Sequence, residues 1–175
     1  MNTTMISKNI QSALNNQINA ELWSAYLYLS MSLDAEAKAL KGFANWFFVQ
    51  WLEEQDHARI FQNHINDRGG KVLLESIDDV MTEWDNPLDM FLDTLEHEKK
   101  VTSMINDLVR LANKEQDFAT LSLLKWFVDE QVEEEKNASD LIDDLKYAGD
   151  NYDVIRAIDK ELAERKHSKP DILKD

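Results

Sequence analysis

The stretch LEEQDHARI, residues 52–60, has the apolar spacing of a helix, but it places Glu54 and His57 where the apolar stripe of that helix should run. The two residues are three positions apart, so both point from one face of the helix. A glutamate there can mean that the stripe is drawn wrongly or that the acid pairs with an arginine. A lone core histidine is more often hydrogen-bonded than a metal ligand. The rest of the chain decides between these interpretations, and with them the fold.

Apolar residues recur at helical spacing in five segments. We therefore expect helices at about 7–36, 42–69, 87–114, 118–148 and 151–165. Ser7 can cap the first helix, Gly69-Gly70 can end the second, and Asn86-Pro87 supplies an N-cap and a first helical residue for the third. With only four Gly and two Pro among 175 residues, the long segments are uninterrupted. The sequence predicts a single all-α domain spanning residues 1–175.

The connections between these segments predict how the helices are arranged. The breaks near residues 37–42 and 113–117 are short, so each should join antiparallel neighbours. The segment at about 70–86 is longer and contains several apolar residues, and structureless loops of that length are uncommon in compact domains. A crossover that runs the length of a bundle resolves this difficulty. We expect a four-helix bundle of two antiparallel hairpins joined by a long crossover, plus a short fifth C-terminal helix.

Each of the four long segments carries polar residues at the centre of its apolar stripe. These residues are Glu21, then Gln50, Glu54 and His57, then Glu98, and finally Gln131 and Glu134. The midpoints of bundled helices meet whichever way the helices point, so these side chains should converge at one level. Burying several unpaired carboxylates is very costly, and no lysine or arginine lies on the stripe centres. Either the acids are protonated or a multivalent cation lies between them, and four contributing helices favour the cation.

The polar positions repeat at a constant offset of 77 residues, as expected for two related half-sites. Glu21, Glu54 and His57 correspond to Glu98, Gln131 and Glu134, and Glu53 corresponds to Glu130. Oxygen ligands with one imidazole suit iron or manganese in an open site better than they suit zinc. Neither the calcium loop motif nor the usual pairing of magnesium with phosphates is suggested. Two metals bridged by one carboxylate would let ferrous ions give two electrons to dioxygen.

The composition narrows the class of protein further. The net charge of -15 argues against nucleic acid and against an anionic membrane as partners. Solubility explains such acidity by default, and a surface or cavity that attracts cations is the sharper explanation. The chain has no cysteine, which excludes disulfides, thiolate nucleophiles and iron–sulfur clusters. It shows no apolar leader and no run of membrane-span length, so we expect a cytoplasmic protein.

Four stretches of the chain resemble the site helices of ferritins, specifically the bacterial non-haem type. They are NAELWSAYLYLSM, LEEQDHARIF, LEHEKKVTSMINDL and LKWFVDEQVEEEK, and the resemblance covers essentially the whole chain, including the crossover and the fifth helix. It implies iron storage in a hollow homo-oligomeric shell of 24 subunits. It also implies a ferroxidase that oxidises Fe(II) with dioxygen or hydrogen peroxide and deposits a ferric mineral inside.

The resemblance implies a role for individual residues of this chain. Glu21, Glu54 and His57 match the ligands of a first iron, with Glu54 bridging, and Glu54, Glu98 and Glu134 match those of a second, with Gln131 beside it. Glu53, Glu130, Glu133 and Glu134 match a third, weaker iron site. Tyr28 and Trp126 match residues near the centre that can donate electrons. Bacterioferritins have a haem-ligating methionine where this chain has Gln55, and a histidine where it has Glu134, so we expect no haem and a weaker second iron.

Other interpretations stay open at this stage. The same di-iron site could serve a peroxidase or oxygenase that acts on another substrate, and the chain could also be a metal-free helical interaction module. Glu53 and Glu133 fit a third metal site and an ordinary solvated face equally well, and Tyr28 could be simple core packing. We interpret Glu135 as solvated and the three histidines His64, His97 and His167 as surface residues. Some of Trp23, Trp46 and Trp51 should lie at subunit interfaces.

Overall fold

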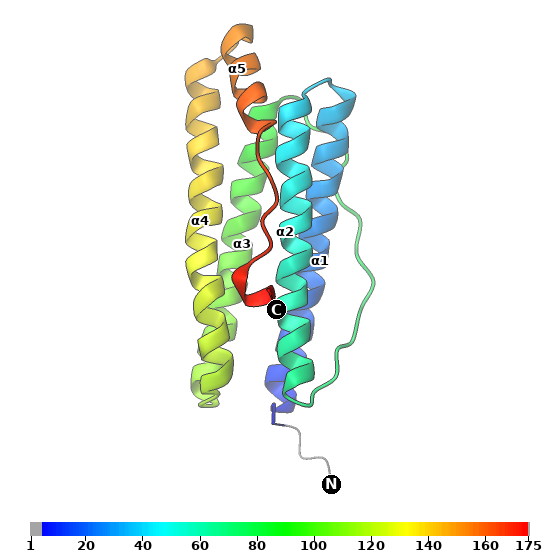
Figure 1. Ribbon diagram of the computed structural model, residues 1–175, viewed down its shortest axis with the longest axis vertical. Helices are drawn as coiled ribbons and strands as arrows, with labels where there is room; N and C mark the ends of the chain where they lie inside the picture. Colours follow the sequence, from blue (N-terminus) through cyan, green and yellow to red (C-terminus); the bar gives the residue numbers. More distant parts are fainter. Residues whose placement is uncertain (1–4, 175) are drawn as a thin grey trace.

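The computed structural model describes residues 5–174, and this part of the chain contains five α-helices and no strand. The helices are α1 (Lys8–Ala37), α2 (Lys41–Asp67), α3 (Pro87–Lys114), α4 (Phe118–Ala148) and α5 (Tyr152–Leu162), and a 3-10 turn η1 (Asp171–Leu173) follows. Helices α1 to α4 form an elongated bundle, and α5 lies across one end of it (Figure 1). The predicted all-α bundle with a short fifth helix is confirmed. No described helix is both long and apolar enough to cross a membrane.

The helices begin and end where side chains satisfy their free backbone groups. The Ser7 hydroxyl accepts from the Ile10 amide at 3.1 Å, and the Asn86 side chain caps α3 with Pro87 as its first residue. Helix α2 has no cap of its own, because Leu40 precedes it. Asp159 of α5 supplies that cap, since its Oδ1 accepts from the Gly42 amide at 2.7 Å and from the Phe43 amide at 3.1 Å. The fifth helix is therefore fixed to the start of the second.

The chain connects the helices as two hairpins. Helices α1 and α2 are neighbours joined by a tight turn, α3 and α4 are likewise, and the segment between α2 and α3 runs the length of the bundle outside α1 (Figure 1). Asn15 holds the start of this crossover through the Lys71 carbonyl and the Leu73 amide. Trp84 anchors its end, buried and hydrogen-bonded to Asp93. The crossover leaves several apolar side chains exposed, namely Leu73, Leu74, Ile77 and Met81.

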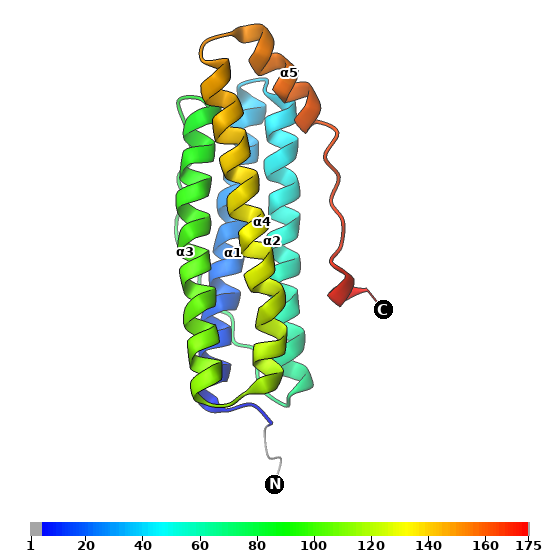
Figure 2. The ribbon, with the colours of Figure 1, turned by 90° about the vertical axis from the view of Figure 1, so that its left-hand side faces the viewer.

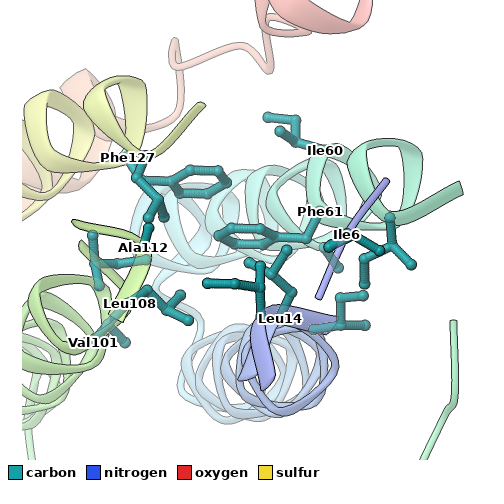
Figure 3. Close-up of a cluster of buried hydrophobic side chains, with 14 of the residues drawn as sticks. Ile6, Leu14, Ile60, Phe61, Val101, Leu108, Ala112 and Phe127 are labelled. Carbon is teal, nitrogen blue, oxygen red and sulfur yellow. The ribbon is translucent and has the colours of Figure 1, made fainter. Parts of the chain in front are cut away.

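The interior consists of two apolar clusters with a polar layer between them. One cluster fills the end of the bundle near the N-terminus, where the rings of Phe61 and Phe127 stack at 4.0 Å between centroids (Figure 3). The other fills the end under α5 and contains Phe43, Phe47 and Phe91. Leu33 and Val128 fit the apolar spacing of their helices, but they are 63% and 37% exposed. Their neighbours Met31 and Phe127 are buried instead.

A C-terminal segment, residues 163–174, was not anticipated from the sequence. The fifth helix ends at Leu162, before the expected position 165, and the chain then turns back alongside α2 (Figures 1 and 2). The Asn45 side-chain amide donates to the carbonyls of Leu162 and Arg165, both at 3.0 Å. Leu173 is nearly buried against the first apolar cluster. The segment is thus held at both of its ends.

Candidate metal centre

Three of the expected ligands form a compact, buried group in the polar layer. Glu21 comes from α1, and Glu54 and His57 come from α2, one helical turn apart. One ligand atom of each lies within 4.8 Å of the others. The Oε2 atom of Glu21 is buried without a hydrogen-bond partner, while its Oε1 accepts from the Gln17 side chain at 2.9 Å. Such an unpaired anionic oxygen is costly alone and fits a metal ion well.

The other half of the layer comes from α3 and α4. Glu98, Gln131 and Glu134 are all buried. The Gln131 side chain donates to Glu98 Oε2 at 3.0 Å, and the Tyr28 hydroxyl donates to Glu98 Oε1. The Gln50 side chain donates to Glu134 Oε2 at 2.9 Å. Both carboxylates are therefore held by neutral donors, which orient them without neutralising their charge.

Burial and mutual repulsion govern the protonation of this layer. Burial, followed by the charge of Glu54, raises the pKa of Glu21 well above its usual range. Burial and the charges of Glu98 and Glu134 do the same to the pKa of Glu54. The pKa of Glu98 is raised to about 8, again by burial first and by Glu134 second. In the metal-free protein the raised pKa values favour the protonated form of these three carboxyls, and a bound cation would replace their protons.

The residues expected at a third metal position have different environments. Glu53 is partly buried, and its Oε2 lies 2.6 Å from Nη2 of Arg165. Burial outweighs the attraction of Arg165 and raises the pKa of Glu53 to about 7, and Glu134 and Glu130 add to this rise. Burial also raises the pKa of Glu130, whereas Glu133 is exposed. The charges of Glu130 and Glu134 thus act on Glu53, whereas Glu133 faces solvent.

The side chains expected to be solvated or at the surface are all partly buried in the structure. Glu135 is half-buried instead of solvated, and it accepts from the Thr102 hydroxyl at 2.6 Å. His97, expected at the surface, is half-buried, with its Nε2 2.7 Å from the Ser24 hydroxyl, and burial lowers its pKa to about 4. His64 and His167 are half-buried and hydrogen-bonded as well, to Thr120 and Asp56.

The two expected electron donors both lie against the centre. Tyr28 is fully buried, with its ring 6.2 Å from Phe47 and its hydroxyl on Glu98. Trp126 is half-buried, and its ring centroid is 5.5 Å from that of His57. Trp46, by contrast, is buried within the subunit itself, so it does not supply an interface.

Arg165 contacts the candidate site, and the sequence pattern did not indicate this contact. The stripes contain no cation, but this arginine reaches Glu53 from the segment after α5. Its position looked like the last turn of the fifth helix, so no local signal pointed to the site. Gln17 was detectable in principle, because it precedes Glu21 by four residues on the same helix face.

Comparisons with known proteins agree with this architecture. The family model described as "Ferritin-like domain" matches residues 11–148. A bacterial non-heme ferritin of Bacteroides fragilis is 44% identical over 161 residues, covering 92% of this chain and 100% of the relative. One from Staphylococcus epidermidis is 38% identical, with coverage of 92% and 97%. A solved open-pore ferritin of Archaeoglobus fulgidus superimposes with a TM-score of 0.91 at 46% identity, covering 92% of this chain and 99% of that one.

Proposed function

The chain belongs to the ferritin family, and on that premise we propose that it oxidises Fe(II) at a di-iron centre within the subunit and stores the ferric product. The observation that carries the proposal is the buried group of Glu21, Glu54 and His57, with its unpaired carboxylate oxygen. A structural role would call for a fixed counter-charge at this place. Among the described residues, Gln17 is the donor to Glu21, and His57 Nδ1 lies 3.3 Å from Glu54 Oε2.

The ligands divide between two iron positions. Glu21 and His57 would hold the first ferrous ion, Glu98 and Glu134 would hold the second, and Glu54 would bridge them. Two ferrous ions give one electron each, and dioxygen takes two electrons and two protons to leave as hydrogen peroxide. With peroxide as oxidant, the O–O bond breaks and two water molecules form. The protons that leave the buried carboxyls when iron binds are available for either reduction.

The neutral hydrogen-bond donors around the carboxylates suit a centre that binds a cation and later releases it. Gln131, Tyr28 and Gln50 fix the carboxylates of the second position through hydrogen bonds. A lysine or arginine in these places would compete with iron for the same oxygens. Amide and hydroxyl groups hold the geometry and leave the negative charge to the metal.

We further propose a third, weaker iron position at Glu53, Glu130, Glu133 and Glu134, and assembly into a shell of 24 subunits. The exposed apolar side chains of the crossover, including Leu74 and Met81, support burial against another subunit. Gel filtration tests the assembly. A mass near 24 times 20.4 kDa supports a storage shell, and a monomer or dimer contradicts it.

The double variant Glu54→Ala/His57→Ala tests the centre. It should lose rapid ferrous oxidation, followed as the rise of ferric absorbance, because it lacks the bridge and the imidazole. Its helical circular dichroism and its mass should be unchanged. The matched control is Glu96→Ala on the exposed face of α3, which should oxidise iron like the wild type. Oxidation at the wild-type rate by the double variant would refute the site.

One observation favours a second candidate, a di-iron peroxidase or oxygenase acting on an organic substrate. A cavity of about 330 Å³ opens between α3 and α4, and its lining includes Gln131 and Thr102 beside the centre. A small organic molecule could reach the second iron position through it. A small assembly that turns over an added substrate without retaining iron would support this candidate over storage.

A further inference from the structure

Arg165 makes more contacts than an exposed surface arginine usually makes. Its Nη2 donates to Glu53 Oε2 at 2.6 Å and to Gln50 Oε1 at 2.5 Å. Its Nη1 donates to the Trp46 carbonyl at 3.1 Å, and its guanidinium lies 4.6 Å from the centroid of the Trp46 ring. The side chain is 22% exposed. A planar guanidinium satisfied on this many sides is held in one orientation.

The segment that carries Arg165 is fastened on both sides of it. The Asn45 side chain donates to the Leu162 carbonyl, which precedes Arg165, and to the carbonyl of Arg165 itself. After it, His167 Nε2 lies 2.8 Å from Asp56 Oδ2, and Leu173 packs against the bundle. Figure 2 shows this segment returning beside α2, the helix that contributes Glu53. These contacts hold the guanidinium on the carboxylate, yet each is a single polar or apolar contact that can open locally.

Arg165 and a metal ion at the third position need the same carboxylate. Glu53 already gives one oxygen to the guanidinium, and a divalent cation beside it would meet a fixed positive charge at short range. Among the described residues, Arg165 is the cationic side chain that forms an ion pair with this acidic group. The neighbouring Glu130 and Glu134 do not change this conflict, because they attract either cation.

We propose that Arg165 is a built-in competitor for the third metal position, so that a metal ion fills this position only when the C-terminal segment releases Glu53. The inference rests on the third iron position of the proposed function. It adds that the segment after α5 controls when Glu53 takes a metal. The ligands of the first two positions lie deeper, and Arg165 reaches them only indirectly, through its hydrogen bond to Gln50. We therefore expect these two positions to fill without release of the segment.

The test is a titration of the metal-free full-length protein with Zn²⁺ alone, by isothermal calorimetry, because zinc binds such ligands without redox chemistry. Four proteins are compared: wild type, Arg165→Gln, Glu53→Gln, and the control Arg59→Gln. Arg59 is exposed on α2, the helix that carries Glu53, and within the described part of the chain its side chain hydrogen-bonds to Gln62 and forms no ion pair. Its variant therefore makes the same charge change away from Glu53. We expect the third zinc ion to bind about tenfold more tightly to Arg165→Gln, the scale of one charge-assisted hydrogen bond.

The controls define each outcome. Arg59→Gln should match wild type, and Glu53→Gln should lose the third ion. Hydrogen exchange in residues 163–173 of the wild type should rise at the zinc concentration that fills the third position, and it should not rise in Glu53→Gln. The inference would be overturned if the third zinc ion bound wild type and Arg165→Gln with equal affinity, or if hydrogen exchange did not rise. In either case, two tightly bound zinc ions would still support the proposed di-iron centre. Failure to bind the first two ions would overturn the proposed function itself.

Discussion

Replacing Glu98 with glutamine should stabilise the metal-free protein at alkaline pH, because the carboxyl is buried without a counter-charge. Glu98 is 1% exposed, and burial with the nearby Glu134 raises its pKa to about 8. Glutamine has nearly the same shape and does not ionise. Its single carbonyl oxygen can accept from Tyr28 or from Gln131, which donate to the two oxygens of Glu98.

The gain in free energy follows from the pKa of Glu98 in the two states. Below its usual value of 4.5 the carboxyl is protonated in both the folded and the unfolded chain and destabilises neither. Between about 4.5 and about 8 the unfolded chain ionises first, so folding stability falls as pH rises, and above about 8 the loss is complete. A difference of about 3.5 pKa units corresponds to about 5 kcal/mol. One lost hydrogen bond offsets about 1 kcal/mol, which leaves about 4 kcal/mol per subunit near pH 9.

Denaturation with guanidinium checks this value. Metal-free wild type, Glu98→Gln and the exposed control Glu96→Gln are unfolded at pH 5 and pH 9 at one subunit concentration, because assembly adds to apparent stability. The midpoint of Glu98→Gln should lie well above wild type at pH 9 and close to it at pH 5, while the control follows wild type. Added Zn²⁺ should favour the wild type, since an amide supplies no charge. A variant less stable than wild type at pH 9, or a pH-independent difference, would refute the reasoning.

Two further substitutions probe the same layer and its framework. Tyr28→Phe removes the hydroxyl that donates to Glu98. Its free energy of unfolding in the same assay should therefore be about 1 kcal/mol lower than that of the wild type. A variant more stable than wild type would contradict this hydrogen bond. Gly42→Ala would place a Cβ 1.5 Å from the Asp159 carbonyl oxygen, so α5 must move. We expect a loss of about 2 kcal/mol or more and faster hydrogen exchange in α5, and unchanged exchange would show that α5 is not packed this way.

The bundle could be predicted from the sequence because its signals are long and repeated. Five apolar stripes, two short breaks and one long break leave few arrangements of the helices, and the midpoints of four long helices must meet. The convergence of Glu21, Glu54 and His57 follows from that geometry. The rotation of each helix about its axis is less well determined by the sequence. An apolar stripe shifted by one position matches the helical spacing almost as well as the true one. Leu33 and Val128, for example, fit the spacing of their stripes but are exposed.

The contacts made by irregular chain could not be predicted in the same way. Residues 163–165 continue a helical pattern in the sequence, but the helix ends at Leu162. The path of the chain after it is fixed by hydrogen bonds from Asn45, which is far away in sequence. The contact between Arg165 and Glu53 depends on that turn. The burial of His97 likewise depends on Ser24 and Trp23 of another helix, and nothing next to it in the chain indicates this. Such positions are decided by tertiary packing and not by local periodicity.

The buried carboxyls of the polar layer destabilise the metal-free bundle, as expected for the proposed metal centre. Two apolar clusters flank the polar layer and supply stability that the layer itself lacks. This lets the chain keep several carboxyls with raised pKa values, and the unpaired Oε2 of Glu21, in its interior. Whatever free energy the layer subtracts from the empty bundle is recovered when a divalent cation binds, and it then appears as affinity for the cation. Filling the layer with hydrophobic or paired residues would make a more stable bundle without the ligands of the proposed metal centre.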